Sequence, residues 1–345
     1  SVLLTRPVIG VADNGDFARI MGATGLSHIS QDYNDRYFGY VNREYRADGL
    51  LFQNNGYFST LIPLVRFAVL ADRILTGGDL FDIRLLALIY ISAFLFSIYL
   101  IARYAGEGRA AAWLTALALV VVFCDIGYIS YFNSLYGEPL SLVSMLLMTG
   151  AAVWLLRQNE VGMGALAVFF IAAFALAGAK VQNSPLGLLA AMFGFRLRNL
   201  RPDRKWRMAT LVIPLLLACF SIAVYFSVPD EIKKCNKYQA VFYGILKDSP
   251  TSEKDLEELG IDPRFAVLAG TDYFMKSYPM DIRAPELEKE LYGRISHGKV
   301  VLFYLRHPSR YLQKLERTAE AGFILRHGYG NFEKAPGVKY GDTAD

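Results

Sequence analysis

Apolar residues concentrate in blocks between about residues 60 and 228, and the chain on either side is more polar. A helix needs about 20 mainly apolar residues to cross a bilayer, with about 17 to 25 tolerated. Five stretches meet this length and are predicted to span a membrane: Leu85–Ala102, Ala110–Ile126, Leu140–Leu156, Met163–Ala179 and Met208–Val228. A sixth, Pro185–Phe195, is short and crosses only if its helix is longer or the bilayer is thinner there. The pattern predicts an all-α, polytopic membrane protein.

The segments outside these spans follow other patterns. Leu61–Leu75 contains Arg66, Asp72 and Arg73, which favours an amphipathic helix at the membrane interface over a span. The polar region after the last span has helical patterns over four stretches: Asp230–Lys247, Ser252–Leu259, Pro285–Ile295 and Ser309–Phe323. The chain starts without Met, with residues that look like the end of a hydrophobic segment, and it ends on a polar stretch. We therefore expect a piece of a longer protein, truncated at both ends.

Three regions are expected. Residues 1–82 hold the end of a first membrane segment and a large first outer loop with amphipathic helices. Residues 83–228 form the transmembrane bundle, and residues 229–345 form a mainly helical extracytoplasmic region.

Basic residues predict the orientation, because cytoplasmic loops of membrane proteins carry an excess of Lys and Arg. The loop Arg196–Arg207 has six basic residues against one acid, Asp203. If Pro185–Phe195 crosses, alternation places Arg103–Arg109 and Arg157–Gly162 on the same cytoplasmic side. Four segments then lie outside: residues 12–82, 127–138, 180–184 and 229–345. We expect a multi-pass protein of the cell membrane whose active side is extracytoplasmic.

Composition and charge narrow the class further. Hydrophobic residues make up 54% of 345 positions, and the mean hydropathy of +0.28 exceeds that of an ordinary soluble domain. A net charge of +4 is too small to indicate a nucleic-acid partner. Cys124, Cys219 and Cys235 have no paired spacing, so neither a disulfide framework nor a zinc site is predicted. The sequence has no HExxH, Walker or GxSxG motif.

Polar clusters gather on the predicted outer side, and the first is Asp13-Asn14-Gly15-Asp16-Phe17-Ala18-Arg19. One interpretation is that Asp13 or Asn14 caps a helix that begins near Asp16. The other is that a carboxylate at the membrane surface acts as a general base or binds a cation. Nearby lipid lowers the local dielectric constant, so the carboxylate interacts more strongly with other charges there. The sequence leaves both open.

Two further clusters lie beside predicted spans. In Tyr128–Pro139, Glu138 precedes Pro139 at the start of a span, where it suits the positive end of a helix or could hold a sugar hydroxyl or a metal. In Lys180-Val181-Gln182-Asn183, Lys180 either snorkels to the surface or binds a phosphate. The first outer loop adds amides mixed with aromatic rings, a composition that suits carbohydrate and also fills ordinary loops, at Asp32–Phe38 and Gln53–Phe58.

These clusters, in this order, resemble those of the GT-C glycosyltransferases, membrane enzymes that take sugar from a polyprenyl-phosphate carrier. More narrowly, three motifs look like those of bacterial WsfD-type hexose transferases for glycan biosynthesis: Asp13-Asn-Gly-Asp-Phe-Ala-Arg, Tyr131-Phe-Asn-Ser-Leu-Tyr-Gly-Glu138 and Ala179-Lys-Val-Gln-Asn183. The resemblance covers nearly all of residues 1–228 and is weaker over the region that follows.

The resemblance implies inverting transfer of a hexose from a polyprenyl-phosphate donor to an extracytoplasmic glycan or lipid-linked acceptor. It implies that Asp16, with Asp13 as the alternate, is the catalytic base. Residues implied to contact substrate are Arg19, Asn133, Tyr136, Glu138, Lys180, Gln182 and Asn183. The chain has Asp-Asn where some relatives have two acids, so no cofactor is assigned and a divalent metal stays open.

Two other functions fit the sequence. A glycolipid transporter or flippase would have broken helices and ionisable groups near mid-membrane, a pattern that only Pro185 and Lys180 suggest. A non-catalytic membrane subunit of a glycan-assembly complex would tolerate replacement of Asp13 and Asp16.

Overall fold

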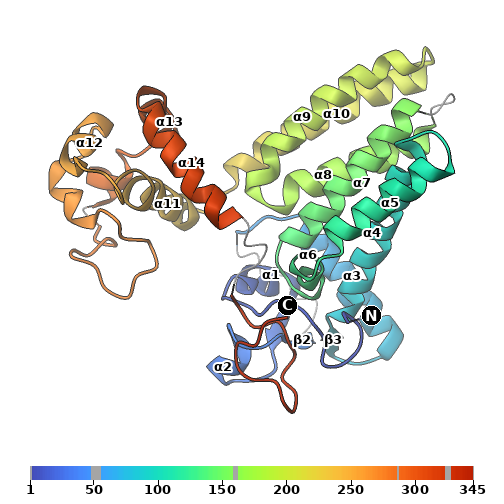
Figure 1. The fold of residues 1–345 in the computed structure, drawn as a ribbon, viewed down its shortest axis with the longest axis horizontal. Helices are drawn as coiled ribbons and strands as arrows, with labels where there is room; N and C mark the ends of the chain where they lie inside the picture. Colours follow the sequence, from blue (N-terminus) through green and yellow to red (C-terminus); the bar gives the residue numbers. More distant parts are fainter. Residues whose placement is uncertain (1, 48–55, 158–161, 286, 323–327, 345) are drawn as a thin grey trace. The chain divides into compact units, whose positions relative to one another are not determined.

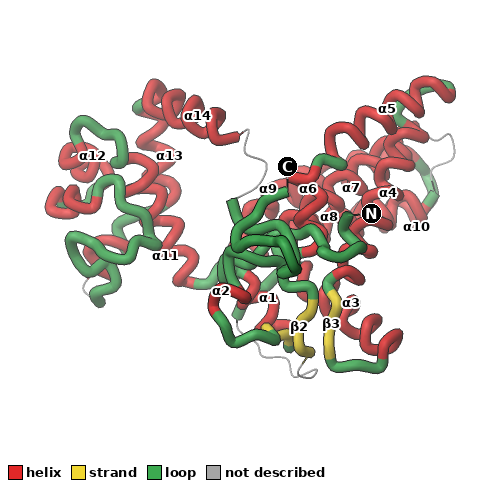
Figure 2. The backbone as a smooth tube through the Cα atoms, turned by 60° about the horizontal axis from the view of Figure 1, so that its bottom comes forward, coloured by secondary structure: helices red, strands yellow, loops and turns green. Residues whose placement is uncertain are grey.

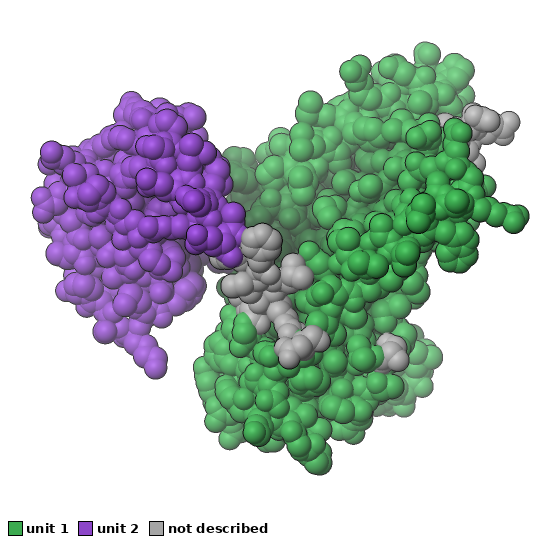
Figure 3. Space-filling model, viewed as in Figure 1, with its two compact units in different colours: residues 1–227, 326–345 green, residues 228–325 purple. Residues whose placement is uncertain are grey.

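The computed structural model describes residues 2–47, 56–157, 162–285, 287–322 and 328–344. The chain divides into two compact units, coloured in Figure 3. Unit 1 comprises Ser1–Ser227 with Arg326–Asp345, and unit 2 comprises Val228–Leu325. The structure is mostly helical (Figure 2), which confirms the predicted fold class.

The membrane part of unit 1 is a bundle of apolar helices. Its elements are α4 (Arg84–Tyr104), α5 (Arg109–Phe123), α6 (Ile126–Ile129), η1 (Ser130–Asn133), α7 (Glu138–Arg157), α8 (Met163–Ala179), η2 (Val181–Asn183), α9 (Ser184–Arg196), η3 (Leu197–Leu200) and α10 (Arg204–Phe226). The closest packing joins α4 to α7, α7 to α8 and α9 to α10. The buried surfaces between them carry small and apolar side chains, including Ala151, Ala165, Phe169 and Leu217.

Three helices among the described residues, α4, α7 and α10, are long and apolar enough to cross a membrane. A fourth span results if α5 and the α6–η1 segment, bent by 66°, cross together. Four of the five predicted spans therefore correspond to a helix or bent pair that can cross a membrane, if α5 and the α6–η1 segment count as one span. The fifth, α8, has the predicted limits but only 17 residues, about 26 Å at 1.5 Å per residue, against a hydrocarbon core of about 30 Å. With 13 residues, α9 is shorter still.

Short connections join α7 to α8, α8 to α9 and α9 to α10, and the joined helices pack against each other, so they run antiparallel (Figure 1). One end of the bundle therefore holds Glu138, at the start of α7, and Lys180, just after α8. The other end holds the basic loops around Arg157, Arg196 and Arg204.

The first loop region folds against this bundle. It contains α1 (Phe17–Thr24), β1 (Leu26–His28), α2 (Tyr33–Arg36), β2 (Glu44–Ala47), α3 (Leu61–Thr76) and β3 (Leu80–Asp82). The strands form an antiparallel sheet in the order β1-β2-β3, with Ser27 opposite Arg46 and Tyr45 opposite Phe81. Tyr45 and Phe81 are buried and anchor the sheet to the core. This small sheet was not predicted, because strands of three and four residues are too short to show an alternating pattern.

Helix α3 has two apolar faces. Leu61, Val65 and Ala68 are buried against the core. Phe67 and Ile74, seven residues apart and so on one face of the helix, are 60% and 74% exposed. An exposed apolar stripe is what a helix at a membrane interface requires. The interfacial placement predicted for this segment stays a prediction.

The last described segment, residues 328–344, belongs to unit 1 and is called the return segment here. It pairs with the N-terminal segment: Gly10 N donates to Asn331 O at 2.8 Å, and Glu333 N donates to Val8 O at 3.0 Å. The polar stretch after the last span was expected to form one region, residues 229–345. The structure divides them, because the polar groups of the return segment are satisfied by the N-terminal segment.

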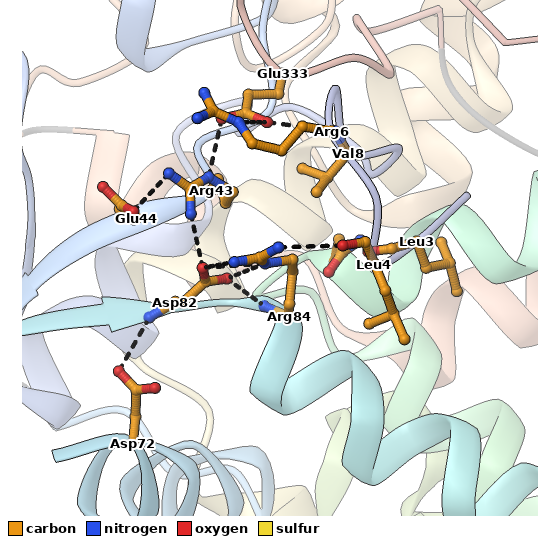
Figure 4. Close-up of polar contacts among 11 residues, drawn as sticks. Leu3, Leu4, Arg6, Val8, Arg43, Glu44, Asp72, Asp82, Arg84 and Glu333 are labelled. Carbon is orange, nitrogen blue, oxygen red and sulfur yellow. Dashed lines mark hydrogen bonds and ion pairs between the residues drawn. The ribbon is translucent and has the colours of Figure 1, made fainter. Parts of the chain in front are cut away.

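A cluster of charged side chains fixes this arrangement (Figure 4). The Glu333 carboxylate accepts from Arg6 Nη2 at 2.8 Å and from Arg43 Nε at 2.9 Å. Arg43 Nη1 also donates to Asp82 Oδ2 at 2.8 Å, and Arg84 Nη2 donates to the same oxygen at 2.7 Å. The cluster ties together the N-terminal segment, the sheet, the start of α4 and the return segment.

Unit 2 has its own core, formed by residues that include Tyr238, Phe242, Phe265, Leu291 and Phe303. Its elements are α11 (Asp230–Tyr238), the π-helix η4 (Gln239–Ile245), α12 (Ser252–Leu259), η5 (Pro263–Leu268), the π-helix η6 (Glu288–Tyr292), α13 (His297–Arg306) and α14 (Pro308–Gly322). Helix α12 has the predicted bounds, and α11 with η4 covers the first predicted stretch up to Ile245, two residues before its predicted end. Among the described residues of the predicted stretch Pro285–Ile295, the structure has the short π-helix η6, and α13 was not predicted.

Candidate functional site

A pocket opens in unit 1 where α1, the segment before α3 and the pocket-side ends of α7 and α8 meet. It holds roughly 600 Å³, its open mouth included. The side chains that bring charge or hydrogen-bonding groups to it are Asn14, Asp16, Arg19, Tyr57, Ser59, Tyr131, Tyr136, Glu138 and Lys180. Five of the nine site residues named from the sequence therefore line one cavity, although they come from separate segments.

Asp16 and Arg19 line the pocket as an ion pair. Arg19 Nη2 lies 2.9 Å from Asp16 Oδ1, and both side chains are about half exposed. Asp16 stands at the N-terminus of α1, yet its side chain makes no capping hydrogen bond. Its carboxylate is therefore available to the pocket rather than to the helix.

Asp13 occupies a different position from Asp16. Its side chain is buried and does not line the pocket. Oδ1 accepts from Gly15 N at 2.7 Å and from Phe17 N at 3.1 Å, and Oδ2 lies 3.4 Å from Nε2 of the buried His28. The capping interpretation therefore describes Asp13, which holds the turn that presents Asp16.

The second ion pair of the pocket joins Glu138 to Lys180. Lys180 Nζ donates to Glu138 Oε1 at 2.6 Å. Glu138 Oε2 is buried and has no hydrogen-bond partner among the described residues. Gly137 permits this approach, because a Cβ at this position would lie 2.7 Å from Lys180 Cγ and 2.9 Å from Ala179 O.

Tyr136 links the pocket wall to the backbone of the first polar cluster, residues 13–19. Its hydroxyl accepts from Asn14 N at 3.1 Å and donates to Ala12 O at 3.0 Å. Burial raises the pKa of the Tyr136 phenol well above its ordinary value, so the hydroxyl stays protonated and can donate. The Asn14 amide also reaches the return segment, donating to Tyr329 Oη at 3.4 Å.

The remaining predicted site residues lie outside the pocket lining. Asn133 is buried, and its Nδ2 donates to Leu3 O at 2.8 Å and Ile9 O at 2.7 Å, so it anchors the N-terminal segment. Asn183 Nδ2 donates to Ser141 Oγ at 2.7 Å and ties the start of α9 to α7. Gln182 is exposed on η2.

Sequence reasoning missed Tyr57 and Ser59 as pocket residues. Ser59 Oγ donates to Ala179 O at 2.9 Å, and Thr60 N donates to Gly178 O at 2.9 Å, so the segment before α3 docks on the end of α8. Tyr57 belongs to the aromatic and amide stretch that was noted for carbohydrate, which was the available signal. Gln53, Asn54 and Asn55 of that stretch lie outside the described residues.

Within the part of the chain that the structure describes, no group of three or more His, Cys, Asp and Glu side chains is placed to hold a metal ion. The charges at the pocket are two carboxylates and two cations, arranged as neighbouring pairs. Such a site offers an acceptor for a proton and several donors for an anion.

The sequence model of the family described as the YfdI N-terminal transmembrane domain matches residues 1–344. The chain belongs to this family. The family is one of transmembrane domains, in agreement with the multi-pass membrane bundle in which α4, α7 and α10 are long and apolar enough to cross a bilayer. No curated protein and no solved structure matches the chain. The resemblance of the motifs to GT-C glycosyltransferases, and the narrower one to WsfD-type enzymes, stays a prediction.

Proposed function

We propose that this YfdI domain carries the active site of a membrane glycosyltransferase, which moves a hexose from a polyprenyl-phosphate donor to an extracytoplasmic glycan or lipid-linked acceptor. The observation that carries the proposal is the pocket that gathers Asp16, Arg19, Glu138 and Lys180 at one end of the helical bundle. The basic loops lie at the other end, which by the positive-inside rule is cytoplasmic. The pocket then faces the extracytoplasmic side.

The proposed reaction is a single displacement with inversion. An acceptor hydroxyl oxygen attacks the anomeric carbon of the hexose while the bond from that carbon to the phosphate oxygen breaks. The Asp16 carboxylate accepts the hydroxyl proton, and the electron pair of the broken bond leaves with the polyprenyl phosphate. Asp16 suits the role of base better than Asp13, because Asp16 lines the pocket and Asp13 is committed to backbone N–H groups.

The departing phosphate gains negative charge, so cations placed beside it lower the barrier. Lys180 has three N–H donors and gives one to Glu138, and the guanidinium of Arg19 has five. Both groups can therefore donate to a phosphate while they keep their carboxylate partners. Glu138 Oε2, which has no partner among the described residues, is suited to accept a hydrogen bond from a sugar hydroxyl.

The surroundings of the pocket suit a lipid-linked donor. Leu61, the first residue of α3, lines the pocket, and the other face of the same helix exposes the apolar side chains Phe67, Leu70 and Ile74. A polyprenyl chain is as apolar as the bilayer interior, so it can lie along this stripe while its phosphate reaches Arg19 and Lys180.

A transporter of glycolipids is the second candidate. The bend of 66° between α5 and the α6–η1 segment, and the break between α8 and α9 beside Lys180, are features that transporters share. The charged residues of the pocket lie at helix ends rather than at mid-helix, which favours the transferase.

The experiment that separates the two uses the full-length protein in proteoliposomes with a radiolabelled polyprenyl-phosphate hexose and a panel of acceptors. A transferase releases polyprenyl phosphate and forms an inverted glycoside only when acceptor is present. Movement of intact donor between leaflets, without release of polyprenyl phosphate, would reject the proposal in favour of transport.

A further inference from the structure

Helix α14 in unit 2 is amphipathic, and a stripe of basic side chains on it is paired with acids of the unit. Arg310 Nη1 pairs with Asp255 at 2.7 Å, and Lys314 Nζ pairs with Asp248 at 2.7 Å. Arg317 contacts the same Asp248. Because residues 310, 314 and 317 are four and three positions apart, they form one stripe along the helix. The basic side of α14 is thus the side that packs on unit 2.

The opposite side of α14 is apolar and exposed. Leu312 is 63% exposed, and Tyr311 and Leu315 lie beside it on the helix and are also exposed. Helix α13, which precedes α14, buries Phe303 in the core and exposes Val301, Leu302 and Leu305. We call these six exposed side chains the α13–α14 apolar surface. Charged side chains usually face water and apolar ones the protein, so a helix oriented the other way indicates an apolar partner.

The position of unit 2 in the chain indicates that this apolar partner is the lipid bilayer. The membrane-spanning helix α10 ends at Phe226, and α11 of unit 2 begins at Asp230. Four backbone steps cover at most about 14 Å, so unit 2 starts at the membrane surface. Tyr225 and Phe226, at the end of α10, are 49% and 71% exposed, as is usual for aromatic residues at a membrane interface.

The charge of unit 2 defines the kind of membrane contact. Residues 228–325 contain 15 Lys and Arg and 15 Asp and Glu, so the unit has no net charge. The basic stripe of α14 is already paired with Asp248 and Asp255. Attraction to anionic headgroups therefore contributes little, and contact depends on burial of apolar side chains.

We propose that unit 2 docks on the lipid bilayer through the α13–α14 apolar surface. The six side chains enter the interfacial layer, while the basic side of α14 stays on the body of the unit. This docking holds unit 2 at the bilayer by a second contact besides its covalent link to α10. It is independent of glycosyl transfer, so it can stand or fall separately from the proposed function.

Spin labels on the full-length protein in neutral phosphatidylcholine nanodiscs test the proposal. Cys124, Cys219 and Cys235 are replaced by Ser, and single labels are placed by Leu305→Cys, Leu312→Cys and, as the control, Gln313→Cys. Gln313 is exposed on a polar part of the same helix. Labels at 305 and 312 should collide more often with oxygen than with a water-soluble nickel complex, at low and at high salt. The label at 313 should show the reverse.

Two results would overturn the proposal. One is a preference for nickel at all three positions, which means that the surface faces water. The other is protection from both reagents at 305 and 312, which means that protein covers it, as in a contact between two copies. A Leu302→Asp/Leu315→Asp variant changes only exposed side chains, so unit 2 should stay folded while the label at 312 loses its preference for oxygen.

Discussion

Replacement of Glu333 tests whether the ion cluster holds the return segment on unit 1. In Glu333→Gln, the carboxylate charge is lost but one carbonyl oxygen remains to accept a hydrogen bond. Arg43 is the important partner, because its side chain is 15% exposed and that of Glu333 is 10% exposed. Hydrogen bonds to charged groups contribute about 1.5 to 3 kcal/mol in such settings. The Arg6 side chain is 61% exposed, so its pair with Glu333 adds about 0 to 1 kcal/mol.

In this variant Arg43 keeps Asp82 and Glu44 as partners, and the glutamine keeps part of the contact with Arg43. We therefore expect the free energy of opening of the return segment to fall by about 2 kcal/mol. At about 1.4 kcal/mol for each factor of ten, the return segment should open roughly 30 times more often. Hydrogen exchange of the Gly10, Val41 and Glu333 amides measures this, since each is bonded between the return segment and the rest of unit 1.

The control is Lys334→Gln on the same segment. Lys334 pairs with Asp35 at 2.7 Å, but its side chain is 62% exposed. Loss of this ion pair should therefore lower the free energy of opening of the return segment by less than about 1 kcal/mol. Equal exchange rates in the two variants would refute the argument that burial makes the Glu333 contacts strong.

The same cluster predicts a dependence on pH. Burial alone would raise the pKa of Glu333, and the hydrogen bonds from Arg43 and Arg6 outweigh burial, so the pKa lies below its usual value of 4.5. A carboxyl whose pKa is lowered by folding stabilises the folded state above the unfolded value. The contribution of Glu333 to the protection of the return segment should therefore be full above about pH 5 and be lost as the pH falls through the lowered pKa.

Further predictions concern the pocket. Gly137→Ala should lower stability by about 1 to 3 kcal/mol in thermal unfolding, because the new Cβ would meet Lys180 and Ala179, whereas Gly164→Ala, with open space at its Cβ, should not. Asp13→Asn should stay folded, because the amide oxygen can still accept from Gly15 N and Phe17 N. Asp13→Ala lacks this acceptor, so its free energy of unfolding should fall by about 1 to 2 kcal/mol. Lys180→Met should raise the KM for donor by roughly 10- to 100-fold through the lost charge-assisted bond, and an unchanged KM would remove Lys180 from phosphate binding.

The sequence predicted the helical membrane bundle well, because spans are set by runs of apolar residues that are visible locally. The limits of α8 and α12 agree with the predicted ones. The shortness of α9 was also visible, in the short apolar run Pro185–Phe195. The bend between α5 and α6 depends on how helices pack, which local hydropathy does not contain. Helix α13 was missed because its apolar residues form one uninterrupted run, Val300–Leu305, and a short apolar run suits a buried strand as well as a helix.

The pocket was predictable in part. Asp16, Arg19, Glu138 and Lys180 were singled out by their positions at the ends of apolar runs, and the structure brings them to one cavity. The difference between Asp13 and Asp16 was not predictable, since it depends on which carboxylate meets the backbone N–H groups of its own turn. The pairing of Glu333 with Arg6 and Arg43 was also out of reach, because the partners are about 300 residues apart.

The most direct test of the proposed function compares Asp16→Asn with Asp13→Asn in the full-length protein, reconstituted with polyprenyl-phosphate hexose and acceptor. We predict that Asp16→Asn folds normally but loses release of polyprenyl phosphate, and that Asp13→Asn keeps most of it. Normal release by Asp16→Asn would contradict the assignment of Asp16 as the base, and no release by the parent protein with any acceptor would contradict the transferase itself.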